Sequence, residues 1–451
     1  MWSLSCREAE AEMGIKKRAV LLAFALVFLA AVILLYGSVN SSLRKAFGNT
    51  DLNAGEKTTI HFIHWSDFPK DIFTSFSGKY PGIQVEFEQF GLQQFPQVQK
   101  ARIASGANMD LMGVIDSDYS RFIEKGYLED LTGKEYLGNY EPGVVEALSQ
   151  RSPEGKIFSV AYRSWVLGMW YNKILFNKYY LKVPENYNDF INVCSVLKLN
   201  GVSPLVLGCR DQSISSYLYF LRIWNGAGDK EDWFNGLNTG ELKWTDKKVA
   251  SSFAEAEDFL KSGFLLKESA NLTYHQAFYK FVNGQAAMCL MGDWSLDMID
   301  ADVEKVCDLG VFPVPYNDKN GSIRVPGVKA GLLIGAFSRS RHKKEADLLL
   351  DHLSRKETAQ YYSDQTMSRS TVKGVTYEKL KYDELWEPLR KKELIAPISA
   401  VAGPEMQQAL DESARELLMG VKSPLQIVGE LQERQEEVNA QQGELLRKTN
   451  Q

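Results

Sequence analysis

The chain has 451 residues, of which 45% are hydrophobic and 24% are charged, so it is long enough for two domains and is not composed like a disordered protein. Its formal net charge of −5 leaves no basic excess to neutralise phosphates, which disfavours nucleic-acid binding. Aromatic residues are abundant by contrast, and several of them are binding candidates below.

An uncharged apolar run, Ala19–Tyr36, follows a Lys-Lys-Arg triplet at 16–18. This pattern predicts an export segment whose basic end stays in the cytoplasm. Its 18 residues exceed the roughly 7 to 15 of a signal-peptide core and reach the roughly 17 to 25 that span a bilayer. No cysteine for lipid attachment occurs at 37–42, so both a retained anchor and a cleaved signal stay open.

The twelve residues before Met13 carry three glutamates, which is unusual ahead of a basic leader. We therefore hypothesise that translation starts at Met13, and a peptide containing Trp2 in the mass spectrum of the mature protein would refute this. Residues 1–40 are expected to form the leader and anchor segment, and 41–57 a polar spacer before the folded part.

The folded part begins with alternating strands and amphipathic helices. The pattern predicts strands at Thr58–Trp65, Ile83–Phe87 and Met109–Ile115, with a helix after Asp67 and another at Phe95–Ser105. Two successive β-α-β units indicate a mostly parallel sheet, whose ligands bind beyond the carboxyl ends of the strands.

An extended, aromatic-rich segment follows at Phe158–Tyr171 and leads through Asn172-Lys173 into a short helix. This order is typical of a chain crossing between two lobes. Further on, apolar residues at helical spacing predict helices at Arg341–Leu353, from Pro404 to Gly420, and after Pro424.

Several motifs carry a family resemblance. Tyr-Asn-Lys stands at 171–173, Tyr-Pro-Gly-Ile-Gln-Val at 80–85, and Phe-Val-Asn-Gly-Gln-Ala-Ala-Met at 281–288, followed by Gly-Asp-Trp at 292–294. Over roughly Thr58 to Asn439, the chain resembles the extracellular solute-binding proteins of ATP-binding-cassette sugar importers. It departs from the family pattern at Ala161, where a proline is common, so the first crossing has a free amide and a less restricted backbone.

The resemblance implies an α/β, two-lobe periplasmic-binding-protein-like fold with an interlobe hinge. The first lobe is then expected at 58–160 and 315–365, and the second at 161–314 and 366–445. It also implies a monomer without a cofactor or a catalytic reaction, on the extracellular face of the cell membrane, anchored or secreted. Its ligand would be a sugar or oligosaccharide, and its partner an ABC permease. A membrane-tethered sugar sensor for a histidine kinase is the alternative.

Sugar sites combine flat aromatic rings with carboxylates, amides and arginine. Trp65 and Asp67 follow the first strand, and Asp116 follows the third. Each has a structural alternative: Trp65 closes the core, and the two acids cap the next helix.

Tyr162 and Arg163 fall at the expected crossing, where arginine bonds hydroxyls or a carboxylate, or forms an interlobe salt bridge. The second lobe offers Asp211, Trp224 and Asp293, and the resemblance implies that Trp294 stacks on a sugar ring. The remaining candidates Trp233, Trp244 and Trp386 are better explained by packing or exposure.

Four cysteines follow the leader, and the two readings are buried free thiols or disulfides. The pairs closing the shortest loops are Cys194/Cys209 and Cys289/Cys307. No metal motif is present in the sequence. The basic runs 339–344 and 390–392 are interpreted as solvated surface, and the alternative is that one of them faces the importer or anionic lipid.

Overall fold

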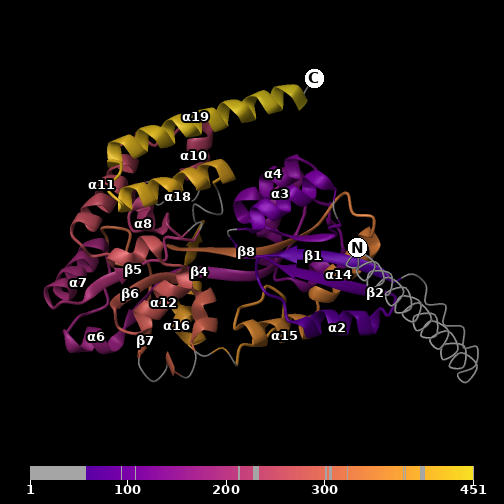
Figure 1. Ribbon diagram of the computed structural model, residues 1–451, viewed down its shortest axis with the longest axis horizontal. Coiled ribbons are helices and arrows are strands. Elements are labelled where there is room, and N and C mark those ends of the chain that lie inside the picture. The colour runs from indigo at the N-terminus through magenta and orange to yellow at the C-terminus, as the bar shows by residue number, and fades with distance from the viewer. Residues whose placement is uncertain are drawn as a thin grey trace, which may run out of the picture. The chain divides into compact units, whose positions relative to one another are not determined.

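The computed structural model describes residues 57–449 except 93, 107, 212–213, 227–232, 300–301, 304–306, 322–323, 379, 381 and 397–401. From Thr58 onward the chain forms one compact unit (Figure 1). The expected leader, anchor and most of the spacer fall outside the described residues. None of the described helices is both long and apolar enough to cross a bilayer.

The first lobe is built on three parallel strands in the order β2, β1, β3. Phe62 of β1 is buried and lies opposite Phe87 of β2 and Leu111 of β3, as the alternating pattern predicted. The predicted helix α3 is confirmed and ends at Gly106, whose φ of +64° is the left-handed conformation that glycine favours. The elements are β1 (Thr58–His64), α2 (Lys70–Lys79), β2 (Ile83–Gln89), α3 (Phe95–Ser105), β3 (Leu111–Val114), η1 (Asp116–Asp118), α4 (Tyr119–Glu124), η2 (Glu135–Asn139), α5 (Pro142–Gln150), η3 (Pro153–Gly155), α14 (Lys343–Leu353) and α15 (Lys356–Thr366).

Two long strands, β4 (Val160–Asn172) and β8 (Arg324–Ala336), belong to both lobes. They pair antiparallel, side by side in the middle of Figure 1. Beyond this pairing β8 continues onto β3 of the first lobe, and β4 continues onto β6 and β7 of the second. A third connection passes beside them, where Ser370 bridges Arg163. The predicted crossing at Phe158–Tyr171 is therefore confirmed as an extended strand.

The expectation of a mostly parallel sheet is wrong for the crossing strands. The sheet order is β2-β1-β3-β8-β4-β6-β5, and it is parallel only at β2-β1-β3, at β5-β6 and where β9 joins β8. The return strand β8 inserts between β3 and β4 and runs antiparallel to both. This pairing joins segments far apart in the chain, so the local periodicity of the sequence gave no sign of it.

The second lobe surrounds the far half of β4. Its side chains alternate between two buried clusters, with Leu167 and Met169 on one face and Val166 and Trp170 on the other. The elements are α6 (Lys173–Lys178), α7 (Tyr187–Leu199), β5 (Ser203–Val206), α8 (Tyr217–Phe220), α9 (Ile223–Gly226), α10 (Trp233–Thr239), α11 (Lys247–Lys261), η4 (Lys267–Asn271), α12 (Tyr274–Val282), β6 (Ala286–Gly292), η5 (Asp293–Met298), β7 (Leu309–Phe312), α16 (Asp383–Arg390), β9 (Glu393–Ile395), α18 (Pro404–Leu418) and α19 (Pro424–Thr449).

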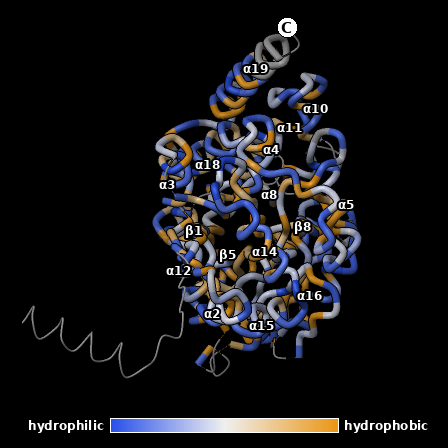
Figure 2. Tube along the Cα trace, turned by 90° about the vertical axis from the view of Figure 1, so that its right-hand side faces the viewer, coloured by the Kyte–Doolittle hydropathy of each residue, from blue (hydrophilic) through white to orange (hydrophobic). Residues whose placement is uncertain are grey.

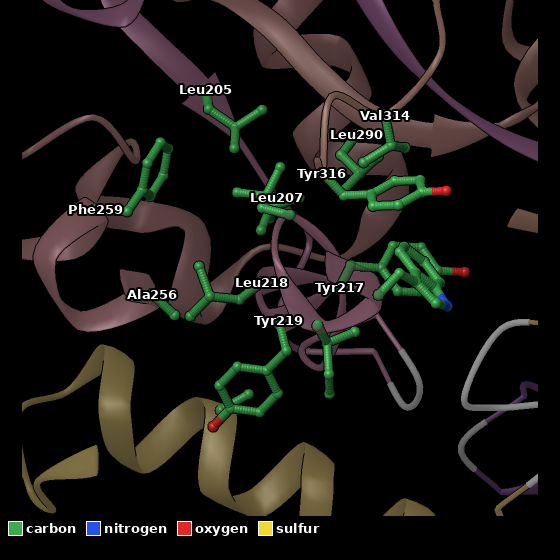
Figure 3. Close-up of a cluster of buried hydrophobic side chains, with 14 of the residues drawn as sticks. Leu205, Leu207, Tyr217, Leu218, Tyr219, Ala256, Phe259, Leu290, Val314 and Tyr316 are labelled. Atoms are coloured by element: carbon green, nitrogen blue, oxygen red, sulfur yellow. The ribbon is translucent and has the colours of Figure 1, made fainter. Parts of the chain in front are cut away.

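Aromatic and aliphatic side chains fill the larger second-lobe cluster. Figure 3 shows part of it, with rings and aliphatic groups from several helices and strands, labelled as Leu205, Leu207, Tyr217, Leu218, Tyr219, Ala256, Phe259, Leu290, Val314 and Tyr316. Along α19 the colours of Figure 2 alternate between hydrophilic and hydrophobic, as in a helix that packs by one face. The buried face includes Ile427, Val428 and Leu431.

The buried clusters also bear on the lobe boundaries. Tyr316 and Val325 pack in the second-lobe clusters, whereas Val372 packs in the first. The division into lobes at the predicted residues stays a prediction.

The four cysteines after the leader are free and buried, which confirms the thiol interpretation over the two short-loop disulfides. Burial raises the pKa of all four thiols, to about 12 for Cys209 and Cys307. None is therefore a reactive thiolate at neutral pH.

Candidate ligand-binding site

The tryptophans of the structure divide into two groups. Of the eight in the described part of the chain, five are buried and three are partly exposed. The buried ones are Trp170, Trp224, Trp233, Trp244 and Trp386, and the partly exposed ones are Trp65, Trp165 and Trp294. The three partly exposed rings come from the loop after β1, the crossing strand β4 and the turn after β6. Partial exposure at these places is what ring stacking on a ligand requires.

Trp165 and Trp294 contact each other, with ring centroids 5.2 Å apart and planes at 86°. Trp65 stacks on His64 at 4.2 Å and meets the ring of Phe95 edge-on at 5.3 Å. Each ring is therefore held by another aromatic group while part of its surface stays open.

A cavity of about 840 Å³ lies beside Trp165 and is lined from both lobes. Pockets for small molecules occupy roughly 300 to 1,000 Å³, so this one accepts more than a single small ring. Its walls come from α5, the crossings β4 and β8, the third connection, η5, α16 and β9. The charged and aromatic lining residues are Glu141, Glu146, Arg151, Trp165, Asp293, Lys329, Arg369, Tyr377, Arg390, Lys392 and Glu393.

Asp293 lies at this cavity in a network of ion pairs. Its carboxylate is 3.0 Å from Nη2 of Arg390 and accepts a hydrogen bond from the Val166 amide of β4. Arg390 also binds Asp383 at 2.7 Å, and Asp383 accepts from Arg369 of the third connection at 2.9 Å. Burial raises the pKa of Asp293 despite the opposing effect of Arg390. The network ties two of the three crossings to the cavity wall.

Arg390 corrects one expectation from the sequence. Its run 390–392 was interpreted as solvated surface, but the Arg390 side chain is only 12% exposed, and only its neighbour Lys391 projects into solvent at 73%. The carboxylate that Arg390 pairs with on η5 is 97 residues away in the sequence. The basic run 390–392 alone therefore could not indicate that Arg390 pairs with Asp293.

Asp116 reaches the cavity through a partner. It binds Nη1 of Arg151 at 2.8 Å, and Arg151 lines the cavity. Burial raises the pKa of Asp116, and Arg151 opposes that rise. Neither Asp116 nor Asp67 caps a helix: α2 and α4 begin at Pro69 and Asp118 without a side-chain cap. Asp67 is exposed.

The side chain of Arg163 has no hydrogen bond or ion pair with any residue in the described part of the chain, and its Nε is buried without a partner. Its backbone lies between Gly331 of β8 and Ser370 of the third connection. The alternative of an interlobe salt bridge is therefore not observed among these residues. Burial, reinforced by the charge of Arg163, lowers the pKa of His64 to about 3. An arginine held without a partner is available to a ligand.

Among the site residues predicted from the sequence, only Asp293 lines the cavity itself, and three others are buried elsewhere. Tyr162 is fully buried in the first lobe, with its ring 4.8 Å from that of Tyr362, and Trp224 is fully buried against Tyr316. Their burial leaves no surface for a ligand in this structure. Asp211 is also buried, and it accepts a hydrogen bond from the Tyr274 amide at the start of α12.

Comparisons with known proteins agree with this geometry. The family described as "Bacterial extracellular solute-binding protein" matches residues 66–360, more than half of the chain. A protein named "Multiple sugar-binding protein" from Streptococcus mutans is 25% identical over 315 residues, which cover 69% of this chain and 73% of that protein. An uncharacterized ABC transporter extracellular-binding protein from Pyrococcus horikoshii is 26% identical over 369 residues, covering 77% and 78%.

Solved structures show the same fold. A structure titled "Chitin oligosaccharide binding protein" superposes with a TM-score of 0.76 at 22% identity, covering 86% of this chain and all of that one. The solute-binding protein RafE in complex with raffinose superposes with a TM-score of 0.66 at 19% identity, covering 85% and 98%. At these identities the likeness extends to the fold alone.

Proposed function

Since the chain belongs to the family of bacterial extracellular solute-binding proteins, we propose that it binds a sugar or oligosaccharide between its two lobes and delivers it to an ABC permease. The observation that carries the proposal is the distribution of tryptophans: three are partly exposed, of which Trp165 lines the cavity between the lobes, Trp294 contacts Trp165, and Trp65 follows β1. A pyranose offers an apolar face to such rings and hydroxyls to charged groups, and both kinds of group are present there.

We assign the binding residues from the exposure of each side chain and from its hydrogen-bond and ion-pair partners. Trp65, Trp165 and Trp294 would contact sugar faces, and Arg163 would donate to hydroxyls or a carboxylate. Asp116 and Asp293 would act mainly by holding arginines at the cavity wall. Asp67 and Asp211 stay predictions, whereas the burial of Tyr162 and Trp224 argues for packing roles instead.

Ligand capture would use the crossings as a hinge. A ligand that touches both lobes stabilises the closed form and shifts the population toward it, and β4 and β8 are the strands that would bend. An affinity near micromolar, about −8 kcal/mol, would allow both capture and release. We place the protein on the extracellular face of the membrane as a monomer, with 1–40 as an anchor or a cleaved signal.

The alternatives have less support. The relatives named above are binding proteins, and none is a sensor subunit, so the histidine-kinase alternative gains nothing from them. They are not enzymes either. A glycosidase would need two carboxyl groups facing each other at roughly 5 to 9.5 Å. At the cavity, the buried Asp293 is paired with Arg390, and the lining residue Glu393 is paired with Arg324.

Calorimetry of the purified protein with chitin oligosaccharides, xylo-oligosaccharides and raffinose tests the proposal. We expect micromolar binding of at least one of these sugars with one site per chain. Peptides and polyamines serve as controls. Binding of either control class, with no response to any sugar, would overturn the carbohydrate assignment.

A further inference from the structure

Each of the three partly exposed tryptophan rings lies against a glycine. A Cβ placed on Gly292 would come within 1.9 Å of Cζ3 of Trp294, which folds back over it. A Cβ on Gly113 of β3 would come within 2.7 Å of Cζ3 of Trp65. On Gly331 of β8 it would lie 3.0 Å from Cδ1 of Trp165. A side chain at Gly292 would have to displace the Trp294 ring. At Gly113 it would also meet His64, at 2.5 Å, and at Gly331 it would also lie 3.0 Å from the Arg163 carbonyl oxygen.

Backbone conformation does not explain these glycines. None of the three has a positive φ, so a residue with a Cβ could adopt the same backbone there. What glycine supplies is close approach: the flat ring rests on the strand where a side chain would otherwise stand. The orientation of the ring is then fixed by the backbone beneath it.

Contact with glycine does not by itself mark a binding ring. A Cβ on Gly168 would come within 2.8 Å of Cζ3 of the buried Trp386, and a Cβ on Gly310 within 2.2 Å of Cε1 of Tyr171, whose ring is partly exposed. These contacts belong to packing within the second lobe. The three tryptophans differ from these two rings in their place: they lie after β1, on the crossing strand β4 and after β6, and Trp165 lines the cavity.

We infer that Gly113, Gly292 and Gly331 are positioning residues that set the angle at which Trp65, Trp165 and Trp294 meet a ligand. The inference rests on the proposed sugar-binding function. A ring whose orientation is fixed before binding loses little freedom when the ligand arrives, which favours affinity and discriminates among ligand shapes. A tilted ring would keep its chemistry but present its face at the wrong angle.

The test compares Gly292→Ala with Gly310→Ala, in which a ring outside the proposed site is displaced in the same way. The full chain is labelled with 5-fluorotryptophan, and the ¹⁹F signal of Trp294 is assigned from its loss in Trp294→Phe. We expect Gly292→Ala to move this signal and to weaken sugar binding by about three- to tenfold, which does not exceed the effect of losing the ring. Gly310→Ala should lower the melting temperature but change neither quantity.

Either half of the result can overturn the inference. It is wrong if the Trp294 signal moves while affinity is unchanged, or if affinity falls while the signal stays in place. The double variant Gly292→Ala/Trp294→Ala adds a further check, since the glycine change should have no additional effect on binding once the ring is gone. If Gly292→Ala does not fold, Gly113→Ala tests the same claim through the Trp65 signal.

Failure of the proposed function would look different. If the unmodified protein binds none of the sugars in the calorimetric panel, the carbohydrate assignment fails. The ¹⁹F signal of Gly292→Ala then still decides whether the glycine holds the ring.

Discussion

Two pairs of tryptophans in this protein have nearly the same geometry and opposite surroundings. In the second-lobe core, Trp233 and Trp244 meet at 6.0 Å and 85°, and at the crossings Trp165 and Trp294 meet at 5.2 Å and 86°. The first pair is buried, and the indole of Trp244 donates to Gln435. The second pair keeps an open face. The comparison shows that ring geometry alone does not separate packing from binding, whereas exposure and support do.

The largest expected effect is a loss of folding stability when the buried pair, Trp233 and Trp244, is disrupted. Trp244→Ala should lower the free energy of unfolding by about 3 to 5 kcal/mol, because it leaves a cavity in a packed cluster and removes the partner of Gln435. Denaturant titration measures the loss. Sugar affinity, measured on the folded fraction, should stay within about twofold, since less than 1 kcal/mol reaches the site. A large affinity change with normal stability would contradict the assignment of this pair to packing.

Arg163 offers a polar test of the open pair, because it precedes Trp165 by two positions on β4. Its side chain has no partner in the described part of the chain. A hydrogen bond to a charged group contributes about 1.5 to 3 kcal/mol, so Arg163→Met should weaken sugar binding by roughly 10- to 150-fold. Calorimetry gives the affinity. Stability should change little, because no ion pair is broken.

The matched control is Arg390→Met. It leaves the buried Asp293 without its cation, whereas Asp383 keeps Arg369, and it should cost about 3 to 5 kcal/mol of stability. If Arg163→Met destabilised the fold as strongly as the control, Arg163 would be a structural residue.

His64 stacks on Trp65, the partly exposed tryptophan of the first lobe. Its lowered pKa predicts that the free energy of unfolding depends on pH. Its folded-state pKa is lowered to about 3, by burial first and by Arg163 second, whereas the unfolded chain takes up a proton near 6.5. The contribution of neutral His64 to the free energy of unfolding is therefore fully present above pH 6.5 and is lost as the pH falls from 6.5 toward 3. Between pH 7 and pH 5 the loss is about 2 kcal/mol.

Denaturant titration at pH 7 and pH 5 measures this slope. His64→Gln should remove most of it, while the same change at the exposed His275 should leave it intact. Equal slopes for the His64 variant and the unmodified protein would show that His64 is protonated in the fold.

Trp294→Ala is the counterpart of Trp244→Ala at the open pair. Loss of one stacking face should weaken sugar binding by about tenfold, or ~1.4 kcal/mol, with a smaller loss of stability than at the core. Calorimetry and denaturant titration on the same preparation separate the two effects. Unchanged affinity would remove Trp294 from the site, although the ring is exposed.

Local structure could be predicted from the sequence where it depends only on residues within one helix or strand. The bounds of α3, the strands β1 and β2 and the free thiols all followed from spacing and composition. Trp65 and Trp294 follow the ends of β1 and β6, where the sequence predicted candidates, and both are partly exposed.

The candidate site was less predictable because it depends on distant pairings. Along β4, three buried residues at 160–162 are followed by three partly exposed ones at 163–165, with a register shift between Arg163 and Trp165. Simple alternation fails at such an irregularity, so the burial of Tyr162 could not be read from the sequence. The same holds for Arg390, whose partner Asp293 lies on another element. The role of Gly113, Gly292 and Gly331 could not be predicted either, because nothing in the neighbouring sequence shows that an aromatic ring packs on them.

The smallest expected effect lies away from both tryptophan pairs, at the contact between α4 and α18. Arg121 of the first lobe binds Glu405 of the second at 3.0 Å, and it also pairs with Asp118. Among the ion pairs between described residues, this is the one that joins a helix of one lobe directly to a helix of the other. Glu405 is 50% exposed, so the pair contributes at most about 1 kcal/mol.

Because the pair bridges the lobes, its contribution should appear in ligand release more than in folding. Glu405→Gln should raise the dissociation rate of a bound sugar by about two- to fivefold at low ionic strength, measured by stopped-flow. Screening should abolish the difference at high salt, where the Debye length falls to about 3 Å at 1 M. Glu412→Gln, an exposed change on the same helix, controls for altered charge on α18. If the two variants release sugar equally fast at low salt, the bridge does not hold the lobes together, and the crossings and rings alone retain the ligand.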